Sequence, residues 1–158
     1  IRKKTDHYAI IRTAWLYGIR GHNFLKTMLQ MSLKNPRKEI KVVNDQFGSL
    51  TWTHRLALQI EKIIDSNIKG TYHATSEGYS TWLEAAEYFL QEMEVPHNVV
   101  PCTTEEYSTP ARRPGNSILG NQKLKAEGIN IMCHWKNDVD MLVSKFREQL
   151  IREANESQ

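Results

Sequence analysis

Between residues 9 and 18 the chain reads Ala9-Ile-Ile-Arg-Thr-Ala-Trp-Leu-Tyr-Gly18. The apolar run over 9–11 is typical of a strand that is buried on both faces in a parallel sheet. A polar loop with two glycines follows, and apolar residues at helical spacing then begin a helix capped by Asn23. Because α/β proteins bind ligands where such strands end, we expect a ligand site at the end of this strand.

The rest of the chain alternates strands with helices, which predicts an α/β fold. Apolar patterns predict strands over 8–15, 40–43, 70–75 and 99–100. Apolar stripes and capping residues predict helices that begin near residues 24, 53, 82, 122 and 137. The polar tail 153–158 is expected to fray.

Only the strands 8–15 and 70–75 have the pattern of central strands. Two parallel strands cannot form a covered sheet by themselves. We therefore expect their other neighbours to come from an N-terminal half that is absent from this chain, or from a partner chain such as a second copy in a homodimer. Alone, the chain should expose an apolar sheet edge and face.

Composition narrows the class of protein. The 158 residues are 40% apolar and 25% charged, with a net charge of +3, as in a soluble globular protein. The sequence has no membrane-spanning run, no signal peptide and no clustered basic face, so we expect a cytoplasmic protein that binds neither membranes nor nucleic acid. Cys102 and Cys133 lack a zinc-like spacing, so no metal site is expected. The chain does not begin with Met, so we expect a fragment of a longer protein.

Several motifs of cofactor-dependent enzymes are absent from the sequence. None of the eight glycines builds a GxGxxG or GxxGxxG turn, which would cradle a dinucleotide phosphate. No Tyr is followed four positions later by Lys, a spacing that places an ammonium beside a phenol and lowers its pKa for proton transfer. We therefore expect neither the cofactor turn nor such a proton donor in this chain.

A set of motifs nevertheless occurs in a telling order: Ile11-Arg-Thr-Ala-Trp-Leu-Tyr-Gly18, Asn23-Phe-Leu-Lys-Thr-Met28, Val43-Asn-Asp-Gln-Phe-Gly-Ser49, Gly70-Thr-Tyr-His73 and Thr109-Pro-Ala-Arg-Arg-Pro114. Together they resemble the C-terminal half of the dTDP-4-dehydrorhamnose reductases, which are extended short-chain dehydrogenases/reductases. The resemblance covers roughly residues 8–146.

The resemblance implies the C-terminal part of a Rossmann-type NAD(P)-binding fold, with its last strands and helices, plus a small substrate-binding domain. Residues 1–75 would end the Rossmann-type domain and carry an inserted substrate-loop segment over about 16–52. Residues 76–158 would form mainly the substrate-binding C-terminal domain. The N-terminal cofactor-binding half would be absent.

The resemblance also implies the reaction of the longer enzyme to which this chain would belong. NADPH or NADH would give hydride to the C4 ketone of dTDP-4-dehydro-L-rhamnose and form dTDP-L-rhamnose. In this family the glycine-rich turn and the catalytic Thr and Tyr-x-x-x-Lys lie upstream, so the chain alone is expected to be inactive. The cofactor would be bound mostly by the missing half, and a need for Mg²⁺ stays open.

By resemblance, Trp15 is the first candidate for contact with the nucleotide-sugar, and the alternative is an indole that packs in the core. Thr13 and Ala14 would approach the nicotinamide through their backbone groups. Asn23 would either cap its helix or place an amide beside a phosphate or sugar, and one side chain can do both.

The loop Asp45-Gln-Phe-Gly48 is placed near the nucleoside by the same resemblance. Gln46 could bind a base or ribose, and the alternative is an ordinary turn. Leu50 stands where the family usually has Pro. In the distal loop, Arg112 and Arg113 are candidates for the pyrophosphate because a guanidinium fork matches phosphate oxygens. Arg113 is favoured, and Arg112 has the alternative of a solvated charge.

Two other functions stay open. The same fold and similar motifs occur in the non-catalytic regulatory subunit of methionine adenosyltransferase, so a regulatory or binding module is one alternative. Another nucleotide-sugar epimerase or reductase of the same superfamily is the other.

Overall fold

The computed structural model describes residues 3–107 and 113–156. The helices are α1 (Phe24–Lys34), α2 (Thr53–Asp65), α3 (Trp82–Glu92), α4 (Gln122–Ala126) and α5 (Trp135–Glu156). The strands are β1 (Ala9–Arg12), β2 (Leu16–Tyr17), β3 (Ile40–Val43), β4 (Phe47–Gly48), β5 (Thr51–Trp52), β6 (Gly70–His73), β7 (Ser80–Thr81) and β8 (Val99–Cys102).

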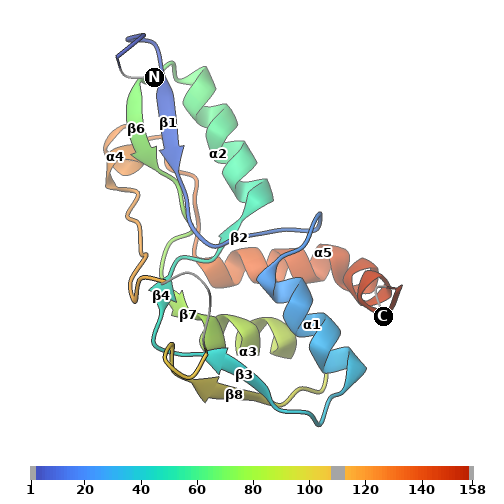
Figure 1. Cartoon of the computed structure of the whole chain (residues 1–158). Coiled ribbons are helices and arrows are strands. Elements are labelled where there is room, and N and C mark those ends of the chain that lie inside the picture. Colours follow the sequence, from blue (N-terminus) through green and yellow to red (C-terminus); the bar gives the residue numbers. More distant parts are fainter. Residues whose placement is uncertain (1–2, 108–112, 157–158) are drawn as a thin grey trace.

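One end of the molecule is built on the parallel pair β1–β6, in register from Ala9 opposite Gly70 to Arg12 opposite His73. α2 and α4 lie beside this pair (Figure 1), and a small apolar core that includes Leu56 and Tyr72 joins them. The two strands expected to be central therefore do pair in parallel. β1 is shorter than expected and partly exposed, because β6 is its only neighbour in the described chain.

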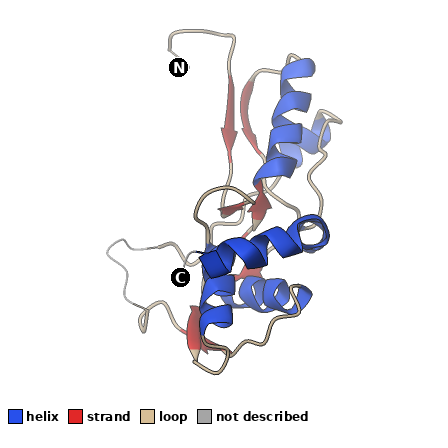
Figure 2. Cartoon of the chain, turned by 90° about the vertical axis from the view of Figure 1, so that its right-hand side faces the viewer, coloured by secondary structure: helices blue, strands red, loops and turns tan. Residues whose placement is uncertain are grey.

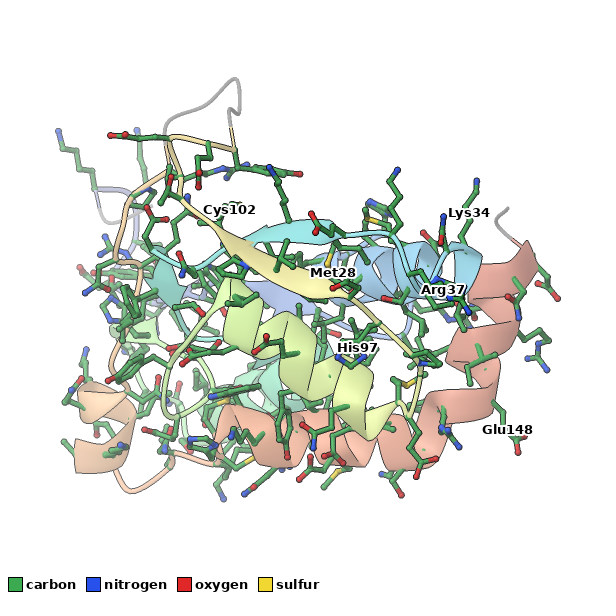
Figure 3. All side chains as sticks on the ribbon, turned by 90° about the horizontal axis from the view of Figure 1, so that it is seen from below. Met28, Lys34, Arg37, His97, Cys102 and Glu148 are labelled. Atoms are coloured by element: carbon green, nitrogen blue, oxygen red, sulfur yellow. The ribbon has the colours of Figure 1, made fainter. Side chains whose placement is uncertain are left out.

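The other end holds the larger core. α1, α3 and α5 pack together, and the parallel pair β3–β8 lies against α3, as Figures 1 and 2 show. This core draws on segments from both halves of the sequence, including Leu29 of α1, Phe89 of α3 and Leu142 of α5. Seen from below, β8 and β3 run side by side above α3 (Figure 3). The domain boundaries inferred from the sequence remain a prediction.

The sequence signals for helix ends are confirmed at two sites. Asn23 caps α1 by accepting a hydrogen bond from the Lys26 N–H at 3.2 Å. Thr81 and Glu84 form a capping box at the start of α3, the helix predicted to begin near residue 82. The expectation of a frayed tail from residue 153 is wrong, since α5 continues to Glu156. Glu153 pairs with Lys26 of α1 at 2.7 Å, a tertiary contact that local sequence does not reveal.

A buried carboxylate joins the two cores. Asp138 lies in the first turn of α5, is fully buried, and accepts hydrogen bonds from Arg55 Nε of α2 at 3.0 Å and from Ser76 Oγ at 3.3 Å. A negative charge is favoured there because helix N-termini carry a positive partial charge. The Cys133 thiol also donates to Asp138, and burial together with this carboxylate raises the pKa of Cys133 to about 11. In the described part of the chain, no helix is long and apolar enough to cross a membrane.

Replacing Asp138 by Asn should lower the free energy of unfolding by about 3 kcal/mol, because it leaves the Arg55 guanidinium without its buried counter-charge. Urea denaturation followed by far-UV circular dichroism measures this change. Asp65→Asn, at an exposed position of α2, should change stability by less than about 0.5 kcal/mol. Equal stability of both variants would contradict a structural role for the Asp138 pair.

Candidate functional site

Trp15 lies just beyond the carboxyl end of β1, where a ligand site was expected. Its backbone has a φ of 47°, a left-handed conformation that costs about 1–2 kcal/mol for a residue with a side chain. The Thr51 N–H fixes this backbone by donating to the Trp15 carbonyl at 3.0 Å. The indole stacks on Trp82, with ring centroids 3.6 Å apart and planes inclined by 11°. Surrounding contacts therefore hold Trp15 in a strained, defined position.

Gly48 covers the other face of the Trp15 indole. A Cβ atom added to Gly48 would lie 2.3 Å from Cε2, and its three nearest neighbours would all be Trp15 ring atoms. Cε2 is bonded to three ring atoms, so another atom can approach it only over a face of the ring. If Gly48 lay on the same face of Trp15 as Trp82, the added Cβ would be nearer to the parallel Trp82 ring than to Trp15. Trp15 is thus clamped between Trp82 on one face and the Gly48 backbone on the other.

Trp82 is the centre of this arrangement. It is the first residue of α3 and lies within the capping box, directly after the N-cap Thr81. The Phe24 ring meets it edge-on, with centroids 4.6 Å apart. Its indole Nε1–H donates to Gln46 Oε1 at 3.2 Å. The Trp82 side chain therefore contacts Trp15, Phe24 and Gln46, which come from three different segments of the chain.

Gln46 is only 8% exposed, and both its amide oxygen and its amide nitrogen are hydrogen-bonded inside the protein. Besides accepting from Trp82, it donates from Nε2 to Thr104 Oγ1 at 3.0 Å. The Thr104 hydroxyl in turn donates to Asp45 Oδ1 at 2.6 Å, and the Thr104 N–H also bonds this carboxylate. These bonds from Thr104 hold the pKa of Asp45 below its usual range. We call Asp45, Thr104, Gln46 and Trp82 the hydrogen-bond relay.

The distal loop joins the site through backbone contacts. The Phe47 N–H donates to the Gly115 carbonyl at 2.8 Å, and the Ser117 N–H donates to the Phe47 carbonyl at 2.8 Å. Arg113, two residues before Gly115, is exposed on this loop. Arg112 lies outside the described residues. The structure therefore brings the segments carrying Trp15, Gln46 and Arg113 together.

Thr13 and Asn23 lie on either side of Trp15 in the sequence. The Asn23 side chain serves as the α1 cap and also donates from Nδ2 to the Gly18 carbonyl at 2.8 Å, which leaves one N–H of its amide for another partner. Thr13 and Ala14, between β1 and Trp15, are half-buried. The Thr13 hydroxyl is buried and has no hydrogen-bond partner among residues 3–107 and 113–156.

Sequence patterns gave Trp82, Gly48 and Thr104 no role in positioning Trp15. The capping box correctly indicated that Trp82 starts a helix. Its stacking on Trp15 depends on how α3 packs beside the end of β1, which local patterns do not encode. Among residues 3–107 and 113–156, no group of three or more His, Cys, Asp or Glu side chains could hold a metal ion.

The chain has an α/β fold, and proteins with similar structures are Rossmann-type reductases and epimerases. A family model described as the RmlD substrate binding domain matches residues 1–148. The chain therefore belongs to this family, and its resemblance to the C-terminal half of the dTDP-4-dehydrorhamnose reductases is confirmed.

Curated relatives agree with this assignment. The spore coat polysaccharide biosynthesis protein SpsK of Bacillus subtilis is 37% identical, over 86% of this chain and 47% of that protein. A dTDP-4-dehydrorhamnose reductase of Burkholderia thailandensis is 36% identical, over 87% of this chain and 51% of that protein. The chain thus spans about half the length of these relatives.

Solved structures show the same relationship. A dTDP-4-dehydrorhamnose reductase from Bacillus anthracis in complex with NADP matches with a TM-score of 0.85 and 35% identity, over 91% of this chain and 50% of that one. A UDP-glucose 4-epimerase from Thermus thermophilus matches with a TM-score of 0.68 and 16% identity, over 88% of this chain and 46% of that one. The second likeness shows a shared fold alone.

Asp45 should titrate below the ordinary aspartate pKa of about 3.9, since its folded carboxylate accepts bonds from Thr104. Its contribution to stability is then present above the unfolded pKa and lost as the pH falls through the lowered folded pKa. Carboxyl ¹³C NMR measures the titration, and Thr104→Val should raise the pKa part of the way back. A pKa at or above the ordinary value would contradict the relay.

Gly48→Ala should destabilise the protein by about 1–3 kcal/mol, because the new methyl group would overlap the Trp15 ring. Gly115→Ala is the matched control, since its Cβ would meet only the Asp45 carbonyl at an ordinary 3.7 Å. Urea unfolding compares the two variants. A Gly48→Ala protein as stable as the control would show that Gly48 does not clamp Trp15.

Proposed function

We propose that this chain is the substrate-binding half of a reductase that converts dTDP-4-dehydro-L-rhamnose to dTDP-L-rhamnose with NADPH. The observation that carries the proposal is the clamped Trp15 at the carboxyl end of β1, with the Asp45–Gly48 loop and the Arg113 loop beside it. Relatives that are at least 30% identical carry the name of this reductase, which supports the choice of substrate.

Each polar group has a role in holding the nucleotide-sugar. The Arg113 guanidinium, with Arg112 as a second candidate, binds the pyrophosphate because its planar fork matches two phosphate oxygens. The free N–H of the Asn23 amide lies at the N-terminus of α1, where anions and polar ligand oxygens are favoured. Trp15 contacts the sugar side. These groups bind and orient the substrate, and none of them transfers a proton.

The residues after β1 fit a bound NADPH. The buried Thr13 hydroxyl has no hydrogen-bond partner in the part of the chain that the structure describes, and an unpaired buried hydroxyl is costly unless a ligand satisfies it. Thr13 and Ala14 would line the nicotinamide side. NADPH supplies hydride for the C4 ketone when bound, and the relative from Bacillus anthracis was crystallised with NADP. The chain alone is proposed to be inactive, with the glycine-rich turn and the proton donor in an upstream half.

The open edge of β1 is proposed to pair with strands of that upstream half, and a homodimer partner is the alternative cover. The parent enzyme is proposed to be cytoplasmic. A second substrate has specific support, because a Streptomyces niveus relative 34% identical to this chain is named dTDP-4-keto-6-deoxy-D-glucose reductase. A panel of dTDP-, UDP- and GDP-sugars would distinguish these substrates by their dissociation constants.

Calorimetric titration of dTDP-L-rhamnose into the chain tests the proposal. Arg113→Ala should weaken binding about tenfold or more, because a hydrogen bond to a charged group contributes about 1.5–3 kcal/mol. Arg37→Ala is the control, since Arg37 lies toward the opposite end of the β3–β8 pair from Cys102 (Figure 3). Equal affinity for the unaltered chain and Arg113→Ala would remove Arg113 from the site.

Activity supplies an independent test. Purified chain mixed with NADPH and dTDP-4-dehydro-L-rhamnose should show no loss of absorbance at the nicotinamide band. Co-expression with the coding sequence immediately upstream should restore the reaction. Oxidation of NADPH by the chain alone would contradict the proposed division of the enzyme.

A further inference from the structure

We infer that Trp82 and Gln46 are positioning residues that hold Trp15 edge-on to its ligand, so that Trp15 contacts the nucleotide-sugar through the rim of the indole and not through a ring face. This inference rests on the proposed function and concerns the same site. It assigns Gln46 a different role from the direct contact with base or ribose expected from the sequence.

The clamp occupies the centre of both faces of the Trp15 indole, where its two rings are fused. Trp82 covers one face at stacking distance, and Gly48 lies against the other. A nucleobase or sugar ring that stacked on Trp15 would have to displace one of them. The rim remains, and Trp15 is half-buried, so part of it reaches the surface. No acceptor for the Trp15 Nε1–H is present among the residues that the structure describes, so the rim can offer a hydrogen-bond donor.

The relay fixes the direction of every hydrogen bond that leads to Trp82. An ionised Asp45 carboxylate can only accept, so the Thr104 hydroxyl donates to it. The Thr104 oxygen is then free to accept from Gln46 Nε2. This orientation turns Gln46 Oε1 toward the Trp82 N–H, which donates to it. The Trp82 ring is therefore held from its nitrogen side by the relay and from another side by the Phe24 edge.

Gln46 keeps one amide N–H and one acceptor lone pair, but the side chain is buried, so a ligand can reach little of it. Its carbonyl oxygen serves Trp82, one of its amide hydrogens serves Thr104, and the residue is buried. Any effect of Gln46 on ligand binding should therefore pass through Trp82. A double-mutant cycle distinguishes this route from direct contact, because two residues that act through one another show non-additive effects.

The experiment measures the dissociation constant of dTDP-L-rhamnose by calorimetry for Gln46→Leu, Trp82→Phe and the double variant. Each single change should weaken binding about tenfold, which corresponds to roughly 1.4 kcal/mol, because Phe keeps a ring at position 82 but cannot donate to Gln46. The double variant should bind as weakly as either single variant. A further tenfold loss in the double variant would overturn the inference and assign Gln46 to the ligand.

Trp15→Phe tests the rim contact itself. It keeps an aromatic ring between Trp82 and Gly48 but removes the N–H, so binding should again weaken about tenfold. Affinity equal to that of the unaltered chain would overturn the rim contact. Near-UV and far-UV circular dichroism supply a readout without ligand, since two stacked indoles couple their transitions. The coupled signal should be lost in Trp82→Phe and in Trp15→Phe, and reduced in Gln46→Leu.

Leu83→Ala is the matched control on the same helix, because Leu83 packs against the larger core and lies next to Trp82 in sequence. It should lower stability while leaving the affinity and the coupled signal unchanged. An equal loss of affinity in Leu83→Ala would overturn the positioning role in favour of general packing. If the unaltered chain binds no dTDP-L-rhamnose, the proposed function fails and this inference fails with it. If the unaltered chain binds dTDP-L-rhamnose and the Gln46→Leu, Trp82→Phe and Trp15→Phe variants bind it equally well, only the inference fails.

Discussion

The stacking of Trp15 on Trp82 connects the two ends of this molecule. Trp15 lies in the loop that follows β1, while Trp82 is the first residue of α3, a helix of the larger core. The contact keeps a left-handed backbone in place at Trp15, and Gly48 makes the approach possible because it has no side chain. Without this contact, the loop after β1 would no longer be packed against α3, and the polar groups around it would not be held close together.

Much of the secondary structure could be predicted because it is encoded locally. The Asn23 cap, the Thr81 capping box and the apolar strand at Ile40–Val43 all lie where the sequence placed them. The parallel pairing of β1 with β6 followed from their apolar runs. The motifs also indicated segments that lie together, since Gly48 of the Asp45–Gly48 loop lies against Trp15.

What could not be predicted depends on contacts between distant segments. Trp82 carries the same local signal as any aromatic residue in a first helical turn, and only its tertiary neighbours make it part of the site. Gln46 reads as a polar loop residue that could bind a ligand, yet its amide is bonded inside the protein to Thr104, a residue 58 positions away. The likeness to an epimerase at 16% identity makes the same point for function, because a shared backbone does not specify the side chains that choose a ligand.

The absence of a side chain at Gly48 has a consequence for how this site can change over generations. The volume above the Trp15 ring is already occupied by the Gly48 backbone, so the two positions constrain each other's acceptable residues. A larger residue at position 48 would first require a smaller one at position 15, and that intermediate would lose the indole. Such reciprocal dependence is epistasis, and it makes the pair difficult to replace by single steps even where the rest of the loop is free to vary.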